Sequence, residues 1–226
     1  MTMIIDRRLF LGSAAMLGGF SLVGCTSTPT EQRGNEQALV DTATATLTRF
    51  KTDAGARATT LLRNARAVLI FPDLVKGGVG LGATRGQGVM LVRAASGWNG
   101  PAFYESSSVS VGLQVGLEES AVVMIVNSDR AFNQLMQSSD MTFKVGGGLS
   151  LVDFNTARQD QLTGADVVVW SRSQGAYGGL TLSGSDISQR MDRDQTYYGK
   201  PVNAEQIGMG TVSNPQAAAL RAAAQS

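Results

Sequence analysis

The sequence predicts an α+β fold: a mainly antiparallel, curled or barrel-like sheet with an N-terminal amphipathic helix and short C-terminal helices. Two observations lead to this prediction. Apolar residues recur at steps of three and four between residues 39 and 65, which is the helical period. Most of the chain that follows, to about residue 182, consists of short apolar or alternating runs separated by turn residues. Short connections favour antiparallel strands over repeated βαβ units.

Composition limits the chemistry that the chain can perform. Its 226 residues are enough for one domain with a substantial core, and 43% hydrophobic and 16% charged residues are globular values. The chain has no histidine and one cysteine, which excludes Ser-His-Asp and Cys-His catalysis, histidine-ligated metals and cysteine-based zinc sites. We therefore expect a protein that is not an enzyme and that carries no cofactor or metal.

The N-terminus has the pattern of an export signal. Arg7 and Arg8 precede an apolar run over residues 9–20 that is too short for a comfortable membrane span. The run ends in Leu22-Val23-Gly24-Cys25, which resembles a bacterial lipobox. We predict that residues 1–24 are a signal peptide. The two arginines leave open whether export follows the general or the twin-arginine route.

Cys25 is the predicted lipid anchor, because the cysteine of a lipobox is acylated and becomes the first mature residue. Residues 25–35 are rich in polar and turn-forming residues, which predicts a lipidated tether. Thr26-Ser27, rather than an aspartate, follow the cysteine. By resemblance to such lipoproteins, this favours the outer membrane of a bacterial cell envelope, with the protein facing the periplasm or the surface.

The predicted first helix has one apolar stripe, and Gly55 allows a break in its middle. A run from Ala67 to Phe71, closed by Pro72, predicts a buried strand. The stripe consists of Leu39, Ala43, Leu47, Phe50, Ala54, Ala58, Leu61 and Ala65.

Further strands and short helices follow along the chain. A helix over Asp129–Gln137 follows a capping Asn127 or Ser128, and later helices follow Asn203 and Asn214-Pro215. Residues 211–226 are an alanine-rich helix or tail. The predicted strands cover residues 89–92, 103–111, 113–117, 121–126, 142–145, 149–152, 167–171 and 177–182.

A glycine-rich segment, residues 77–88, could suggest a phosphate loop. It matches neither the P-loop nor the dinucleotide fingerprint, and more strand follows it instead of a helix. Gly78, Gly80 and Gly82 alternate with apolar residues at period two, which predicts a strand with one bare face. A helix, another strand or a ligand must lie against that face.

Several short motifs run in order through residues 36–210. They include Ala67-Val68-Leu69-Ile70-Phe71-Pro72, Lys76-Gly77-Gly78, Gly97-Trp98-x-x-Pro101-x-Phe103, Gly112-x-Gln114-x-Gly116, Val167-x-x-Trp170-Ser171, Gly179-x-x-Leu182-x-Gly184 and Tyr197-Tyr198-Gly199. The ordered series resembles the SYLF domain family. Its matching residues at Gly77, Gly78, Pro101, Phe103, Tyr197, Tyr198 and Gly199 are candidate family-motif positions.

The resemblance implies membrane binding. Eukaryotic SYLF members bind phosphoinositide-rich membranes and associate with actin, and bacterial members are often lipoproteins. We expect no actin partner for an exported bacterial protein. The SH3 or FYVE modules that eukaryotic members often carry are not visible in this sequence.

Charge is unevenly distributed along the chain. Residues 47–93 contain eight basic and two acidic residues, whereas residues 94–226 contain eight basic and twelve acidic ones. A basic region beside a lipid anchor predicts contact with anionic headgroups. The alternative is a solvated face whose arginines pair locally. The candidate lipid-binding residues are Arg57, Arg63, Arg66, Lys76, Arg85 and Trp98.

Trp98 follows a turn, where a tryptophan can enter a membrane interface; the alternative is that it closes the end of the sheet over the core. Glu118-Glu119 and Asp192-Arg193-Asp194 are interpreted as turns. The function expected is a lipid-anchored protein that binds anionic phospholipid headgroups. The alternative is a structural protein that binds another envelope protein. Nucleic acid is disfavoured by the near-neutral charge and by export.

Overall fold

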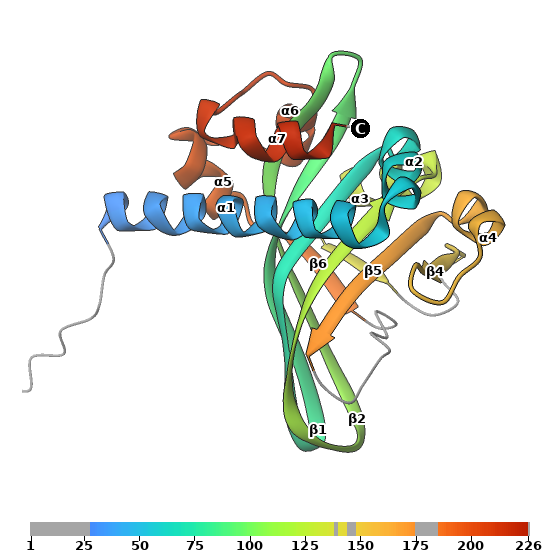
Figure 1. The fold of residues 1–226 in the computed structure, drawn as a ribbon. Helices are drawn as coiled ribbons and strands as arrows, with labels where there is room; N and C mark the ends of the chain where they lie inside the picture. Colours follow the sequence, from blue (N-terminus) through green and yellow to red (C-terminus); the bar gives the residue numbers. More distant parts are fainter. Residues whose placement is uncertain (1–27, 138–139, 144–147, 175–184, 226) are drawn as a thin grey trace, which may run out of the picture.

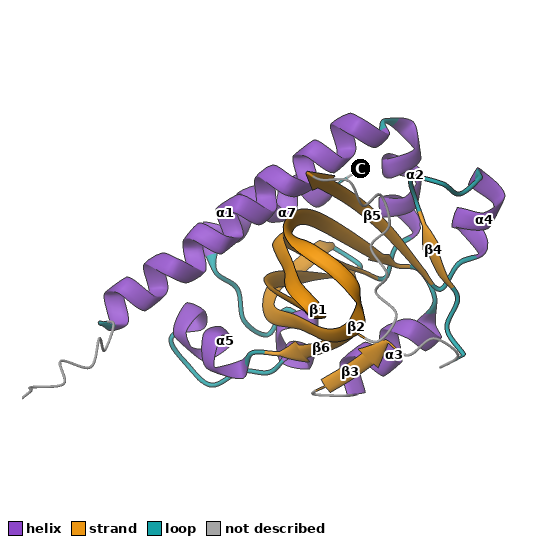
Figure 2. Cartoon of the chain, turned by 90° about the horizontal axis from the view of Figure 1, so that it is seen from below, coloured by secondary structure: helices purple, strands orange, loops and turns teal. Residues whose placement is uncertain are grey.

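The computed structural model describes residues 28–137, 140–143, 148–174 and 185–225. The predicted signal peptide, Cys25 and the predicted strand over residues 177–182 lie outside the described residues. The described strands form a curled sheet in the order β3-β6-β2-β5-β4, with β1 paired along β2 (Figures 1 and 2). The pairs are antiparallel except β4 with β5, and the sheet is not closed. The predicted α+β class is confirmed.

Helix α1 (Pro29–Ala54) crosses one side of the sheet (Figure 1). It begins earlier than the apolar stripe predicts, because Thr28 and Glu31 form a capping box and Pro29 occupies the first turn. Residues 29–35, assigned to the tether from their composition, are therefore helical. Gly55, at a φ of 56°, separates α1 from α2 (Ala56–Asn64), so the predicted break is confirmed.

Strands β1 (Ala67–Ala94) and β2 (Gly97–Val126) form one long antiparallel hairpin. Pro72 does not end the first strand, because it lies in an irregularity of the pairing between Phe71 and Leu74, where a missing N–H donor is tolerated. Glu118-Glu119 lie in β2 and not in a turn. The separate short strands predicted from residue 89 to residue 126 are parts of this hairpin.

The hairpin folds back on itself, as its curl in Figure 2 shows. A Cβ on Gly88 would lie 2.5 Å from the carbonyl oxygen of Ile70, and one on Gly86 would lie 2.6 Å from that of Asp73. The later half of β1 therefore packs directly on its earlier half. The glycine-rich segment is strand, as predicted, and at Gly86 and Gly88 the earlier half of the same strand packs against it. What lies against Gly78, Gly80 and Gly82 stays a prediction.

Each face of the sheet carries its own core, because side chains alternate along the strands. On the α1 side, Val68, Ile70, Val123, Ile125 and Trp170 pack with Leu47 and Phe50 of the helix. On the other side, Leu69, Phe71, Val122 and Met124 pack with residues of α3 (Asp129–Gln137) and α6 (Ala204–Gly208).

The remaining elements complete these two layers. They are β3 (Asp140–Phe143), β4 (Leu151–Asp153), α4 (Gln159–Gly164), β5 (Val167–Gln174), β6 (Ser185–Gln189), α5 (Met191–Tyr198), the 3₁₀ turn η1 (Pro215–Ala217) and α7 (Ala218–Ala224). Asn203 and Asn214 cap the last helices as predicted. Helix α7 packs against α1, where the Lys51 ammonium donates to the carbonyl oxygen of Ala223 at 3.0 Å.

The interpretation of Asp192-Arg193-Asp194 as a turn is wrong, because these residues lie in α5 and two of them are buried. Arg193 forms an ion pair with the buried Glu36 of α1 at 2.5 Å. Asp194 accepts hydrogen bonds from the backbone N–H of Phe103 at 2.8 Å and from the amide of Gln189 at 2.7 Å. Burial raises the pKa of Asp194 to about 7, although these hydrogen bonds favour its charged form.

We predict that Gly88→Ala lowers the free energy of unfolding by about 1–3 kcal/mol, because the added methyl group overlaps the Ile70 carbonyl. Urea denaturation measures the change. The matched control is Gly34→Ala in α1, where a Cβ meets nothing within 4 Å and the helix gains about 0.5–1 kcal/mol. Equal effects of the two substitutions would contradict the close packing of β1 on itself.

Candidate binding groove beneath helix α1

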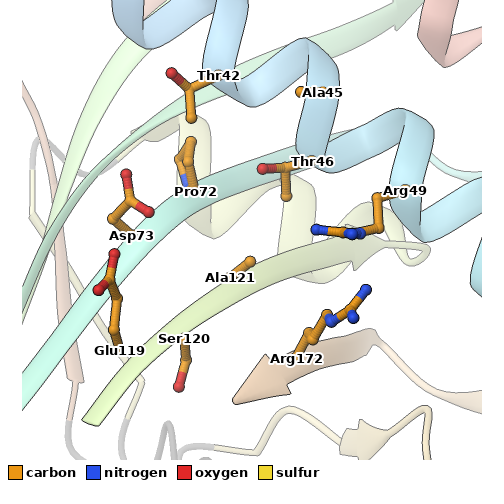
Figure 3. Close-up of a pocket in the computed structure, with 10 residues that line it drawn as sticks. All are labelled: Thr42, Ala45, Thr46, Arg49, Pro72, Asp73, Glu119, Ser120, Ala121 and Arg172. Atoms are coloured by element: carbon orange, nitrogen blue, oxygen red, sulfur yellow. The ribbon is translucent and has the colours of Figure 1, made fainter. Parts of the chain in front are cut away.

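A groove of about 460 Å³ opens between α1 and the sheet (Figure 3). This volume is within the range of small-molecule sites. Four elements meet there: α1, the irregular part of β1, β2 and β5. The lining residues are Thr42, Ala45, Thr46 and Arg49 from α1, Pro72 and Asp73 from β1, Glu119, Ser120 and Ala121 from β2, and Arg172 from β5.

The groove lies where the core on the α1 side ends. On β2, the apolar residues that face α1 are followed by Ala121 and then Glu119. On β5, the buried Trp170 is followed on the same face by Arg172, which pairs with Ala121 across the strands. On β1, Ile70 is followed by Pro72 and Asp73. Three strands thus change from apolar to polar at the same level of the sheet.

The charges in the groove are separated. Figure 3 shows the guanidinium groups of Arg49 and Arg172 toward one end of the groove and the carboxylates of Asp73 and Glu119 toward the other end. In the described part of the chain, no ion pair joins the two ends. The groove is therefore polarised, with a positive and a negative end.

The positive end is only weakly neutralised by the protein. Arg172 forms an ion pair with Asp53 of α1 at 3.3 Å, with side-chain exposures of 44% and 41%. A pair as exposed as this contributes at most about 1 kcal/mol, because water screens it. Arg49 is exposed and has no ion pair or hydrogen bond with another described residue. Both guanidinium groups can therefore bind an anion.

Thr46 lies between the two ends and has an unused hydroxyl group (Figure 3). The residue is only 8% exposed, yet its hydroxyl makes no hydrogen bond with the described chain. Its neighbours Thr44 and Thr48 each donate to the carbonyl four residues earlier, at 2.8 Å. The Thr46 hydroxyl is not among the fully buried polar atoms that lack a partner in the described chain, so it is accessible from the groove, where a ligand can bind it.

The lipid-binding residues predicted from the sequence do not line this groove, and separate elements hold several of them. Arg57 donates to the carbonyl oxygen of Ala157 at 2.8 Å and lies 4.4 Å from the centre of the Phe154 ring. Arg66 pairs with Asp129 of α3 at 3.0 Å.

Arg85 of β1 pairs with Glu105 of β2 at 2.8 Å. Lys76 lies in β1 opposite Glu118, and Arg63 is exposed on α2. Local pairing, the alternative considered for the basic region, thus describes Arg57, Arg66 and Arg85. A role in lipid binding stays a prediction for these residues.

Trp98 is a core residue and not the tip of a loop. It is 3% exposed, and the guanidinium group of Arg93 lies 4.3 Å from its ring centre. Arg93 in turn donates to the carbonyl oxygens of Ala65 and Leu62 at the end of α2. The prediction that Trp98 enters the membrane interface is therefore corrected: the side chain closes the sheet over the core.

The family-motif residues near the C-terminus are structural. Tyr197 packs edge-on against Phe103, with ring centres 5.2 Å apart. The Tyr198 hydroxyl donates to the carbonyl oxygen of Pro101 at 2.8 Å, and Gly199 ends α5 in the left-handed conformation. Together these residues fix α5 to β2.

Gly77 and Gly78 also have a structural position, because they pair with Leu117 and Gly116 in the middle of the hairpin. Among the described residues, no group of acidic or cysteine side chains could hold a metal ion. None of the described helices combines the length and the apolar character needed to cross a membrane.

The groove is not apparent from the sequence. Arg49 and Asp73 stand there only as two charges, the prediction for Glu119 was a turn, and neither Thr46 nor Arg172 belongs to a recognisable motif. The available signal was the end of the apolar alternation in three strands. Only the register of β2 with β1 and β5 shows that these three ends lie side by side.

We predict that Thr46→Val leaves the free energy of unfolding unchanged or raises it, because the hydroxyl group has no partner in the protein. Thr44→Val is the matched control in the same helix. It removes a hydrogen bond and should cost about 1 kcal/mol. Thermal and urea unfolding measure both variants. A loss for Thr46→Val as large as that for Thr44→Val would show that the Thr46 hydroxyl is already used in the fold.

Comparison with known proteins agrees with the ordered motifs. The family described as Ysc84, Las17-binding protein actin regulator, matches residues 107–226. An SH3 domain-containing protein of Schizosaccharomyces pombe is 27% identical over 166 residues, which are 70% of this chain and 38% of that protein. The SH3 domain-containing YSC84-like protein 1 of Bos taurus is 26% identical over 69% of this chain and 46% of its own.

Protein YSC84 of Saccharomyces cerevisiae is 26% identical over 166 residues, which are 70% of this chain and 35% of the yeast protein. The matches thus span less than half the length of each of these three relatives. The family match itself covers more than half of this chain and extends from β2 through α7. The chain belongs to the Ysc84 family and contains its SYLF domain.

Proposed function

We propose that this SYLF domain binds the phosphate of membrane lipid headgroups and that the positive end of the groove is the binding site. The observation that supports this most strongly is the position of Arg49 and Arg172, two guanidinium groups side by side with little internal neutralisation. Guanidinium groups bind phosphate oxygens through paired hydrogen bonds. The lipid binding implied by the SYLF resemblance supports the same proposal.

The proposed role is binding and not catalysis. The groove contains two arginines and two carboxylates at opposite ends, without a nucleophile held by a base. The family is described by Las17 binding and actin regulation, and the names of the three relatives refer to SH3 domains or to YSC84. We propose that this chain acts in a bacterial envelope without actin.

Anchoring at Cys25 would place α1 close to the bilayer. Pro29 follows Cys25 by four positions, so the two residues can be at most about 14 Å apart. Thr42 to Arg49 lie 13 to 20 residues further along the helix, which corresponds to about 20–30 Å. The groove reaches the headgroups if α1 lies nearly parallel to the membrane, and we propose this orientation at the outer membrane.

The first prediction concerns the positive end of the groove. A chain of residues 25–226 carrying Cys25→Ser should float with vesicles that contain phosphatidylglycerol more than with phosphatidylcholine alone. Arg49→Gln combined with Arg172→Gln should weaken binding about tenfold or more, because each charged hydrogen bond contributes about 1.5–3 kcal/mol. Vesicle flotation measures the bound fraction.

Arg63→Gln is the matched control, because Arg63 is an exposed arginine that does not line the groove. It should bind vesicles as the unsubstituted chain does. Equal recovery with both vesicle types, unaffected by the paired substitution, would refute the proposed function. Loss of binding in the Arg63 variant alone would instead favour the basic surface predicted from the sequence.

The second prediction concerns the anchor. In cells, the full chain should partition into the detergent phase on phase separation, and Cys25→Ser should move it into the aqueous phase, because acyl chains provide the membrane affinity. Immunoblotting of the two phases measures the distribution. A full chain that stays in the aqueous phase would contradict acylation at Cys25.

A further inference from the structure

The negative end of the groove has no role in binding a phosphate alone. We propose that the groove recognises a phosphoethanolamine group, with the phosphate on Arg49 and Arg172 and the primary ammonium on Asp73 and Glu119. The phosphate half of this inference rests on the proposed function. The ammonium half depends on the two carboxylates and can fail independently.

The spacing of the strands suits a ligand that carries both charges. Strand β2 lies between β1 and β5, so the backbones at Asp73 and Arg172 are two strand spacings apart, or about 10 Å. Glu119 lies two residues from Ala121, the partner of Arg172, which is about 7 Å along β2. The side chains extend into this space from both ends (Figure 3). A short ligand with a charge at each end can therefore contact both ends of the groove, whereas inorganic phosphate can contact only one end.

The carboxylate pair itself favours a cationic partner. Asp73 and Glu119 come from neighbouring strands and point toward the same end of the groove (Figure 3). Neither forms an ion pair with another described residue. An ammonium group placed between them would donate hydrogen bonds to both carboxylates.

Thr46 supplies a neutral contact between the charged ends. Its hydroxyl lines the groove without a partner in the described chain and can donate to a phosphate oxygen. Ala45 and Ala121 line the same part of the groove and leave room for the two-carbon bridge of the ligand. Charge at both ends, an unpaired hydroxyl and small residues between them are the features that this ligand needs.

The same geometry predicts discrimination against choline. A primary ammonium has three N–H donors, which can be shared between the carboxylates of Asp73 and Glu119. The trimethylated nitrogen of choline has no N–H donor and is larger. Its phosphate would still reach the arginines, so phosphocholine should bind about as inorganic phosphate does.

The test uses the full chain in an uncharged maltoside detergent, with calorimetric titration of O-phosphoethanolamine, phosphocholine and inorganic phosphate. We expect phosphoethanolamine to bind at least about tenfold more tightly than the other two, which corresponds to about 1.4 kcal/mol. Asp73→Asn combined with Glu119→Gln should reduce its affinity to that of phosphate. Arg49→Gln combined with Arg172→Gln should abolish binding of all three ligands. Arg63→Gln should leave the affinity for each of them unchanged.

Two further titrations show whether the phosphoethanolamine group comes from a membrane lipid or from a soluble compound. Glycerophosphoethanolamine and vesicles of phosphatidylethanolamine in phosphatidylcholine represent the lipid headgroup, and O-phosphoethanolamine represents a free ester. Carboxylate-dependent binding in any arm supports the inference. Tighter binding in the lipid arms assigns the group to a membrane lipid, and tighter binding of the free ester assigns it to a soluble compound.

The outcomes separate this inference from the proposed function. If only the arginine substitutions weaken binding, and phosphoethanolamine has no advantage over phosphate, the ammonium site is overturned and phosphate binding stands. If the arginine substitutions also leave binding unchanged, the proposed phosphate site and the proposed ammonium site are both overturned. Circular dichroism and thermal unfolding confirm that each variant is folded, and Glu119→Gln alone, at an exposed position, provides a milder test of the negative end.

Discussion

The contact of β1 with itself is the constraint on which the rest of this fold depends. Gly86 and Gly88 let the later half of the strand approach the backbone of Asp73 and Ile70, where the Cβ of a larger residue would overlap the carbonyl oxygens. Because the hairpin folds back there, the two ends of β2 pair with different strands. Residues near Val123 pair with β5, and residues near Ser106 pair with β6. The curl of the sheet and the placement of the helices on its two sides follow from this arrangement (Figure 2).

Helix α1 links the fold, the groove and the proposed anchor. Its apolar stripe covers one face of the sheet, and Glu36 near its start forms the buried ion pair that holds α5. The polar residues beside the stripe form one wall of the groove. An anchor just before the helix would thus orient the wall that carries Arg49 and Thr46. In this account, α1 covers the core on one side of the sheet, forms one wall of the groove and connects the domain to the membrane.

Local signals in the sequence predicted the features that depend on local chemistry. The break at Gly55, the caps at Asn203 and Asn214 and the strand formed by the glycine segment are all of this kind. The features that were missed depend on distant pairing. Asp194 looked exposed because its partner, the backbone of Phe103, is 91 residues away. The groove was missed for the same reason, since its charges come from three strands that the sheet register aligns and from α1, which packs over them.

The central claim is that a phosphate with a nearby amine binds beneath α1, and arginine side-chain NMR tests it most directly. In a titration of the full chain with glycerophosphoethanolamine, the account predicts that the Nε–H signals of Arg49 and Arg172 shift together with the backbone amide signals of Thr46 and Ala121, while the Nε–H signal of Arg63 does not move. Shifts confined to Arg63 and other arginines outside the groove, or no saturable shift at Arg49 and Arg172, would contradict it.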